Sequence, residues 1–173
     1  MHFDNTDVNS KQAEKEMLFF VPLCTHENAQ ECLSIGFDNI PQEAIKLAAN
    51  ITTQANQGER FDSESFDVVV TNDENINKQD IFRVLKKDGV LCMKLGNDVK
   101  KQLAELGSFY RIVMPFFGMK LVFASNKYHP TADIILDKAD FLEVVEYYNA
   151  DIHLASFAIY EKAKKELKGI IKA

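Results

Sequence analysis

The sequence predicts an α/β protein with a mostly parallel sheet and helices on both faces. Three apolar runs have the length and β-branched content of buried strands, at 31–37 (ECLSIGF), 66–73 (FDVVVTND) and 89–95 (GVLCMKL). Stretches with helical apolar spacing lie between them, so strands and helices alternate along the chain. Two further strand-like runs meet at a short link, Phe116–Gly118, which predicts an antiparallel pair at one edge.

The N-terminal third is predicted to contain a flexible tail followed by two helix–strand pairs. Residues 1–12 are polar and are expected to be flexible. The stretch 13–20 (AEKEMLFF) predicts a short helix, which precedes the strand at 31–37. A second helix is expected after Pro41, because a missing N–H costs nothing at a helix start. The run NITTQA then predicts a β-branched strand at 50–55.

The middle of the chain is predicted to alternate between helices and buried strands. A polar turn at 57–65 precedes the strand at 66–73, and NINKQDIFRVLKK (75–87) has the apolar spacing of an amphipathic helix. Asp88-Gly89 is the pattern of a turn. The next helix is expected to begin at Asn97 or Asp98 and to end at Gly107.

The C-terminal third is predicted to hold the antiparallel pair and then only helices. FYRIVMPF (109–116) and MKLVFAS (119–125) form the pair, and helical segments are expected over 137–149, 150–160 and 160–173. The order suits a Rossmann-like fold of the class I methyltransferase type, with an antiparallel edge strand and a helical C-terminus. We expect residues 13–173 to form one such domain.

Composition excludes several functional classes. The 173 residues are 46% hydrophobic and 27% charged, as in one globular domain. No apolar run approaches the roughly 20 residues of a membrane helix, and no signal-peptide pattern is present, so we expect a cytoplasmic protein without membrane contact. The net charge of −6 argues against nucleic-acid binding. The cysteines lack zinc-site spacing, so no metal is predicted.

Polar residues follow the predicted strands at the edge where ligands bind in such sheets. These are the carboxyl ends of the strands, and three of them fall at 36–39, at 71–75 and after Leu95. The second, Thr-Asn-Asp-Glu-Asn, is the most polar strand end in the chain. Its acids are candidates for chemistry, although acids are also common in solvated βα turns.

Long stretches of the chain are similar to segments of one enzyme family and occur in that family's order. EMLFFVPLCTHENAQECLSIGFDN (16–39) resembles the segment that carries the family's glycine loop. FDVVVTNDEN (66–75) and DIFRVLKKDGVLCMK (80–94) resemble its acid-bearing strand and the following helix and strand, and EYYNADIHLASFAI (146–159) resembles its C-terminal signature. The family is the spermidine synthases, or polyamine aminopropyltransferases. The likeness spans about residues 15–165, and no stretch resembles the family's N-terminal β domain. The pattern is most similar to that of the short, divergent epsilonproteobacterial members.

This resemblance implies a reaction and its ligands. Members transfer an aminopropyl group from decarboxylated S-adenosylmethionine, a co-substrate, to the amine of putrescine. They need neither a metal nor a bound cofactor. The amine attacks a carbon beside a sulfonium, so the enzyme must align both molecules and keep the amine deprotonated. A polyamine or nucleoside ligand is therefore expected.

The resemblance also assigns site residues. Gly36, Asp38 and Asn56 fall where the family binds the nucleoside, Asn56 being the amide in place of a ribose-binding acid. In a gapless match Asn72 takes the place of the catalytic acid, and Asp73 stands beside it. An amide is not a general base, so a one-residue shift would be needed to bring the carboxylate into place.

Two more residues are expected at the amine substrate, and two functional readings remain open. Glu74 supplies negative charge, and Tyr147 supplies an aromatic face that attracts amines or simply packs. The chain is either an aminopropyltransferase with a reduced site or a non-catalytic relative that binds a ligand or a subunit. Self-association as a homo-oligomer is expected, with Phe19 and Phe20 marking an exposed apolar face.

Overall fold

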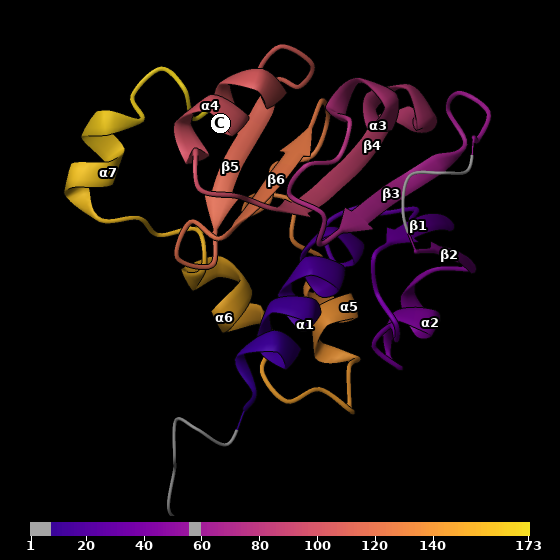
Figure 1. Ribbon diagram of the computed structural model, residues 1–173. Helices are drawn as coiled ribbons and strands as arrows, with labels where there is room; N and C mark the ends of the chain where they lie inside the picture. The colour runs from indigo at the N-terminus through magenta and orange to yellow at the C-terminus, as the bar shows by residue number, and fades with distance from the viewer. Residues whose placement is uncertain (1–7, 56–59) are drawn as a thin grey trace, which may run out of the picture.

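The computed structural model describes residues 8–55 and 60–173, and its centre is a six-stranded sheet with the order β2-β1-β3-β4-β6-β5 (Figure 1). The first four strands run parallel, and β6 runs antiparallel to both of its neighbours. The predicted fold class is thereby confirmed, with the β5–β6 pair at one edge. The strands are β1 (Glu31–Ile35), β2 (Asn50–Gln54), β3 (Phe66–Thr71), β4 (Leu85–Lys94), β5 (Ile112–Phe116) and β6 (Leu121–Ser125).

Helices cover both faces of this sheet. In Figure 1, α1, α2, α5 and α6 lie below the sheet, whereas α3 and α4 lie above it and α7 lies beyond β5. The helices are α1 (Ser10–Leu23), α2 (Ala44–Leu47), α3 (Lys78–Val84), α4 (Val99–Leu106), α5 (Leu136–Asp140), α6 (Ala150–Ala155) and α7 (Glu161–Glu166).

The two apolar layers follow from side-chain alternation along the buried strands. Val68 and Val70 point into the cluster that holds α1, whereas Val69 points into the cluster that holds α3 and α4. Every residue of β3 is buried, as expected for a central parallel strand covered on both faces. The sheet therefore gains stability from apolar burial on both sides. Its polar residues are at the strand ends, where they are available to contact a ligand.

Helix α1 is longer than predicted and lies in the core. Asn9 caps it by accepting a hydrogen bond from the Lys11 N–H, and the helix continues through Pro22. Phe19 and Phe20 are both fully buried, so the expectation that they form an exposed face for self-association was wrong. Their aromatic area packs against the sheet because the second half of this helix is apolar all round.

Strand β4 begins earlier than predicted, and Asp88-Gly89 is part of it instead of a turn. Pairing with β3 is irregular here, with a register shift between Phe66 and Val68. A Cβ on Gly89 would lie 2.9 Å from the Lys86 carbonyl oxygen. The glycine is thus required by close packing inside an irregular strand. The Asp-Gly sequence is compatible with both such a strand and a turn, so the sequence alone does not separate the two.

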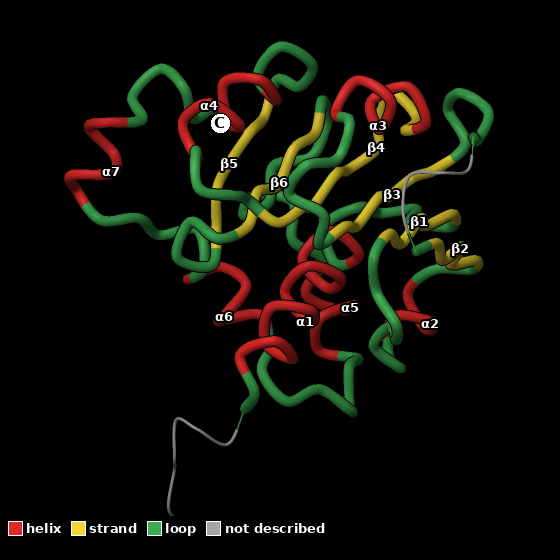
Figure 2. Tube along the Cα trace, viewed as in Figure 1, coloured by secondary structure: helices red, strands yellow, loops and turns green. Residues whose placement is uncertain are grey.

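The C-terminal helices are shorter than predicted, and residues 141–149 are mainly loop, as Figure 2 shows between α5 and α6. The backbone N–H groups of Glu146, Tyr147 and Tyr148 all donate to the carboxylate of Glu16 at 3.0–3.2 Å. Glu16 is 1% exposed. These donors are therefore satisfied by a buried side chain on α1, and a helix is not needed to satisfy them.

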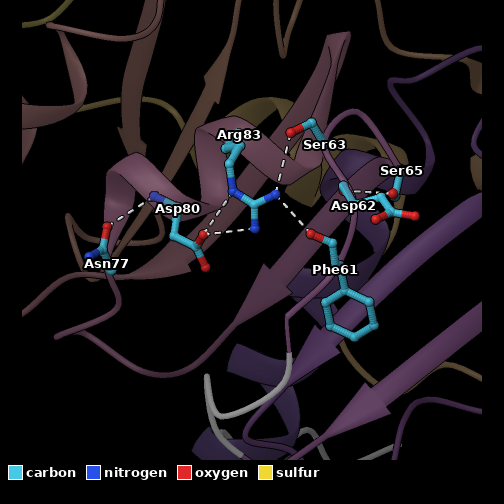
Figure 3. Close-up of polar contacts among 7 residues, drawn as sticks. All are labelled: Phe61, Asp62, Ser63, Ser65, Asn77, Asp80 and Arg83. Carbon is cyan, nitrogen blue, oxygen red and sulfur yellow. Dashed lines mark hydrogen bonds and ion pairs between the residues drawn. The ribbon is translucent and has the colours of Figure 1, made fainter.

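A polar network ties the loop before β3 to α3 (Figure 3). The guanidinium of Arg83 donates to the Asp80 carboxylate at 3.0 and 3.1 Å, to the Phe61 carbonyl at 2.8 Å and to the Ser63 hydroxyl at 3.4 Å. Asn77 accepts from the Asp80 N–H and so caps α3. The side chains of Arg83 and Asp80 are 39% and 41% exposed, so this network anchors the loop but adds little stability.

Candidate functional site

A polar pocket of about 380 Å³ opens at the carboxyl ends of β1, β3 and β4, beside the first turns of α1. Gly36, Asp38 and Asn72, three of the residues singled out in the sequence, lie on its wall. Such a position between parallel strands is the usual place for a ligand in an open α/β sheet, and the size suits a small molecule.

Gly36 and Asn72 are locked together where β1 and β3 end. The Asn72 side-chain amide donates to the Gly36 carbonyl at 2.9 Å. Gly36 has φ +88°, and a Cβ added there would collide with the Asn72 side chain. A glycine is therefore required for two reasons, the left-handed backbone and the close approach of the amide. The donor side of the Asn72 amide is held by backbone instead of being aimed at a substrate.

Phe37 forms part of the same wall. Its ring packs edge to face against Phe19, with ring centroids 5.0 Å apart. The ring is half-buried and extends the core cluster of α1 toward the pocket. An apolar wall thus stands directly after Gly36, where a glycine loop would let backbone approach a ligand closely.

The polar face of α1 forms the opposite wall, which sequence reasoning missed. Lys11, Glu14, Lys15 and Leu18 all line the pocket, and the spacing i, i+3, i+4 and i+7 places them on one helix face. The Lys15 ammonium donates to the Asn39 carbonyl across the pocket at 3.2 Å. The sequence spacing indicates that these residues share one helix face, but it does not show whether that face points toward the strand ends or toward solvent.

Lys94, at the end of β4, completes this part of the wall. Its ammonium lies 3.4 Å from the carboxylate of Glu14, which is 22% exposed. The pair joins α1 to the sheet. The lysine is therefore part of the pocket and not merely a surface residue at the end of a strand.

Asp73 and Glu74 lie at the same sheet edge but are not among the described residues that line this pocket. The Asp73 carboxylate accepts from the Asn75 N–H at 2.9 Å, and its own N–H donates to the Thr71 hydroxyl at 3.0 Å. This is a self-capped turn. The Glu74 carbonyl accepts from the Gln102 side chain on α4, so Asp73 is held by its own turn and Glu74 by a contact with that helix.

Tyr147 lies in a different pocket, also of about 380 Å³, between α6 and the link that joins β5 to β6. Its ring meets Phe117 edge to face at 5.8 Å, and the Lys120 ammonium sits 5.8 Å from the Phe117 ring. The structure therefore separates Tyr147 from Gly36, Asp38 and Asn72. Asn56, the other expected nucleoside-binding residue, lies outside the described residues.

One group of side chains in the described chain has ligand atoms close enough to hold a metal: His26, Asp67 and Asp88, all within 4.8 Å. It lies near the amino ends of the strands, away from the pocket. His26 Nδ1 accepts from the Asn28 N–H, so a neutral ring carries its proton on Nε2. Burial lowers the pKa of His26, although Asp67 and Asp88 oppose this.

Asp67 is likewise already satisfied. One of its oxygens accepts from the N–H groups of Gln30 and Glu31, and the other pairs with Lys86 at 3.1 Å. Protein donors thus occupy both oxygens of Asp67, whereas His26 Nε2 is buried without a hydrogen-bond partner. The arrangement acts as a buried polar tie between β1, β3 and β4.

Comparison with known proteins finds sequence similarity to polyamine aminopropyltransferases. No family model matches it. A polyamine aminopropyltransferase of Helicobacter acinonychis (strain Sheeba) is 34% identical over 136 residues, and one of Helicobacter pylori (strain G27) is 32% identical. Each alignment covers 70% of this chain and 52% of the relative. The chain thus spans about half the length of the curated relatives it matches.

Solved structures show the same fold. A spermidine synthase from Thermotoga maritima superposes with a TM-score of 0.72 at 22% identity, covering 91% of this chain and 75% of that one. A spermidine synthase in complex with the transition state analogue AdoDATO gives the same score and identity, covering 74% of that chain. Within residues 8–55 and 60–173, no helix is both long and apolar enough to cross a membrane. This chain is therefore similar in sequence to polyamine aminopropyltransferases over about half of their length, and it shares the fold of spermidine synthases.

Proposed function

We propose that this chain is a ligand-binding relative of the spermidine synthases that does not itself transfer aminopropyl groups. The observation that carries the proposal is the state of Asn72. It stands in the resemblance where the family has a catalytic acid, and its amide is bonded to the Gly36 carbonyl. An amide cannot take the proton of an attacking amine, so the pocket wall lacks a base at this position.

The pocket nevertheless keeps features of a small-molecule site. Gly36 and Asp38 lie on its wall at the end of β1, and the Asp38 side chain is exposed to the pocket's solvent. A volume of about 380 Å³ is sufficient for a nucleoside-sized molecule. A relative with the same fold was solved in complex with AdoDATO, which supports a related ligand for this chain.

Two measurements on the purified chain test the proposal. Calorimetry with methylthioadenosine is expected to show binding. A product assay with decarboxylated S-adenosylmethionine and putrescine is expected to show no spermidine above the protein-free reaction. Spermidine formation that scales with protein concentration would refute the loss of transfer. Absence of heat with methylthioadenosine, decarboxylated S-adenosylmethionine and putrescine alike would refute ligand binding.

A second candidate function is aminopropyl transfer itself, with Asp73 as the base. Asp73 directly follows Asn72 at the end of β3 and is half-buried, and its carboxylate accepts from the backbone N–H of Asn75. If spermidine forms, Asp73→Asn is expected to reduce kcat on the order of 10²-fold or more, as loss of a general base does. Asp62→Asn, in the loop before β3, is the matched control. Equal turnover in both variants would rule out Asp73.

A further inference from the structure

We propose that the pocket at the ends of β1, β3 and β4 selects a ligand that bears a carboxylate or phosphate over a cationic one. The inference rests on the proposed ligand-binding function and names the charge class of the ligand. It goes against the expectation from aminopropyl transfer, because decarboxylated S-adenosylmethionine and putrescine are both cations at neutral pH.

The charges on the pocket wall carry the first step. Lys11, Lys15 and Lys94 face two carboxylates, Glu14 and Asp38. Lys94 and Glu14 pair with each other, so their charges largely cancel. Lys15 reaches only the carbonyl of Asn39. In the part of the chain that the structure describes, neither Lys11 nor Lys15 forms an ion pair. The wall is therefore left with two ammonium groups against the Asp38 carboxylate.

The position of α1 adds to this positive potential. The helix has 14 residues, and its pocket-lining face begins in the first turn, at Lys11. Its peptide dipoles place a partial positive charge at this end. The first turn, which the structure describes completely, contains no acidic side chain to neutralise that charge. Helix end and lysines thus act in the same direction on a molecule in the pocket.

Two of the three lysines are held by contacts, whereas Lys11 is exposed. Lys15 is half-buried and joins α1 to the loop after β1, whereas Lys94 joins α1 to β4. An anion that enters the pocket meets the Lys15 ammonium already held at the wall, with the exposed Lys11 ammonium on the same helix face. Charge-assisted hydrogen bonds to such donors favour carboxylate and phosphate oxygens, and a ligand ammonium group would meet repulsion instead.

Two probes that differ only in a phosphate test the inference. Calorimetry in 50 mM salt compares adenosine 5′-monophosphate with adenosine, and we expect the phosphate to improve Kd on the order of tenfold. Decarboxylated S-adenosylmethionine is expected to bind more weakly than adenosine. Raising the salt to 300 mM is expected to reduce the advantage of the monophosphate, because screening acts on its charge.

Variants then locate the effect. Lys11→Gln and Lys15→Gln are each expected to reduce the ratio of adenosine Kd to monophosphate Kd several-fold. Lys162→Gln, on the exposed face of α7, is the matched control and is expected to keep the full preference. A thermal melt of each variant shows that the fold is kept, and the wild-type comparison of probes does not depend on any variant.

The outcomes separate this inference from the proposed function. Equal Kd for adenosine 5′-monophosphate and adenosine overturns the charge preference but leaves ligand binding intact. Tighter binding of decarboxylated S-adenosylmethionine than of adenosine overturns the preference as well. No measurable heat with any probe, methylthioadenosine included, overturns the proposed function and the charge preference together.

Discussion

Acidification is expected to destabilise the chain through His153, which is fully buried between the C-terminal segment and the core. Its Nδ1 lies 2.7 Å from the Tyr148 hydroxyl, and its Nε2 lies 2.8 Å from the Pro130 carbonyl oxygen. A neutral ring satisfies both contacts by accepting at Nδ1 and donating at Nε2. Burial lowers the pKa of His153 from its ordinary 6.5 to about 4, against a smaller opposing effect of the bond to Pro130.

The sign and size of the effect follow from this pKa difference. As pH falls, His153 in the unfolded chain binds a proton near pH 6.5, whereas the folded chain resists protonation until about pH 4. The stabilising contribution is therefore complete above the unfolded pKa and is lost between pH 6.5 and 4. The full difference corresponds to roughly 3 kcal/mol, and about 2 kcal/mol of it is already lost at pH 5.

Urea unfolding at pH 7 and pH 5 measures this loss. Other groups also titrate, so the informative quantity is the difference between wild type and His153→Gln. The variant is expected to be less stable at pH 7 but to lose about 2 kcal/mol less between pH 7 and pH 5. The reasoning is refuted if both proteins lose the same free energy. An NMR titration of His153 with a midpoint near 6.5 would refute it equally.

Three further predictions concern other features, and all are tested by urea unfolding at pH 7. Glu16→Ala is expected to cost about 3 kcal/mol, since it leaves one buried and two partly buried N–H donors of residues 146–148 without their acceptor, whereas Glu16→Gln keeps one oxygen and costs less. Gly36→Ala is expected to cost about 1–3 kcal/mol, and Asn72→Ala is expected to relieve part of that cost because the clash disappears. Asp98→Ala removes the acceptor that caps α4 at the Lys101 N–H and is expected to cost about 1 kcal/mol.

Each of these has an outcome that contradicts it. Equal stability of Glu16→Ala and Glu16→Gln would show that the carboxylate does not hold the loop. Additive costs for Gly36→Ala and Asn72→Ala would show that the two side chains are not coupled. For Asp98, the exposed Asp62→Ala is the control, and an equal loss in both would remove capping as the reason.

Most of the sheet could be predicted because its signals are local. The run of valines in β3 fits no surface helix, and the short link after Phe116 permits only an antiparallel pair. The caps of α4 at Asp98 and Gly107 were found for the same reason. Each of these elements depends on residues adjacent in sequence.

The errors arise where a distant partner decides the structure. Residues 141–149 have helical spacing, but Glu16 takes up the backbone donors that a helix would otherwise satisfy. Asp88-Gly89 has the composition of a turn, but it lies inside β4 between Leu85 and Val90, which both pair with β3. In both cases a tertiary contact overrides a local preference.

The residues of the candidate site also fall into those that local sequence signals predict and those that tertiary packing decides. Gly36, Asp38 and Asn72 could be found because strand ends can be predicted from sequence, and parallel strands bring their ends to one edge. The lysines of α1 could not, because their role depends on how the helix rotates against the sheet. Tyr147 was expected at the amine substrate because aromatic faces attract amines, with simple packing as the alternative, and the structure puts it in a separate pocket.

The contact between Glu16 and residues 146–148 has a consequence for how the chain is made. Its partners are 130 to 132 positions apart in sequence, so the carboxylate stays hydrated while most of the chain is being synthesised. Closing such a long loop carries an entropic cost, and contacts of this separation form slowly. The first helix therefore reaches its final environment only after residue 148 has left the ribosome. A nascent chain stalled before that point carries an apolar helix whose Glu16 carboxylate has not yet met its backbone donors.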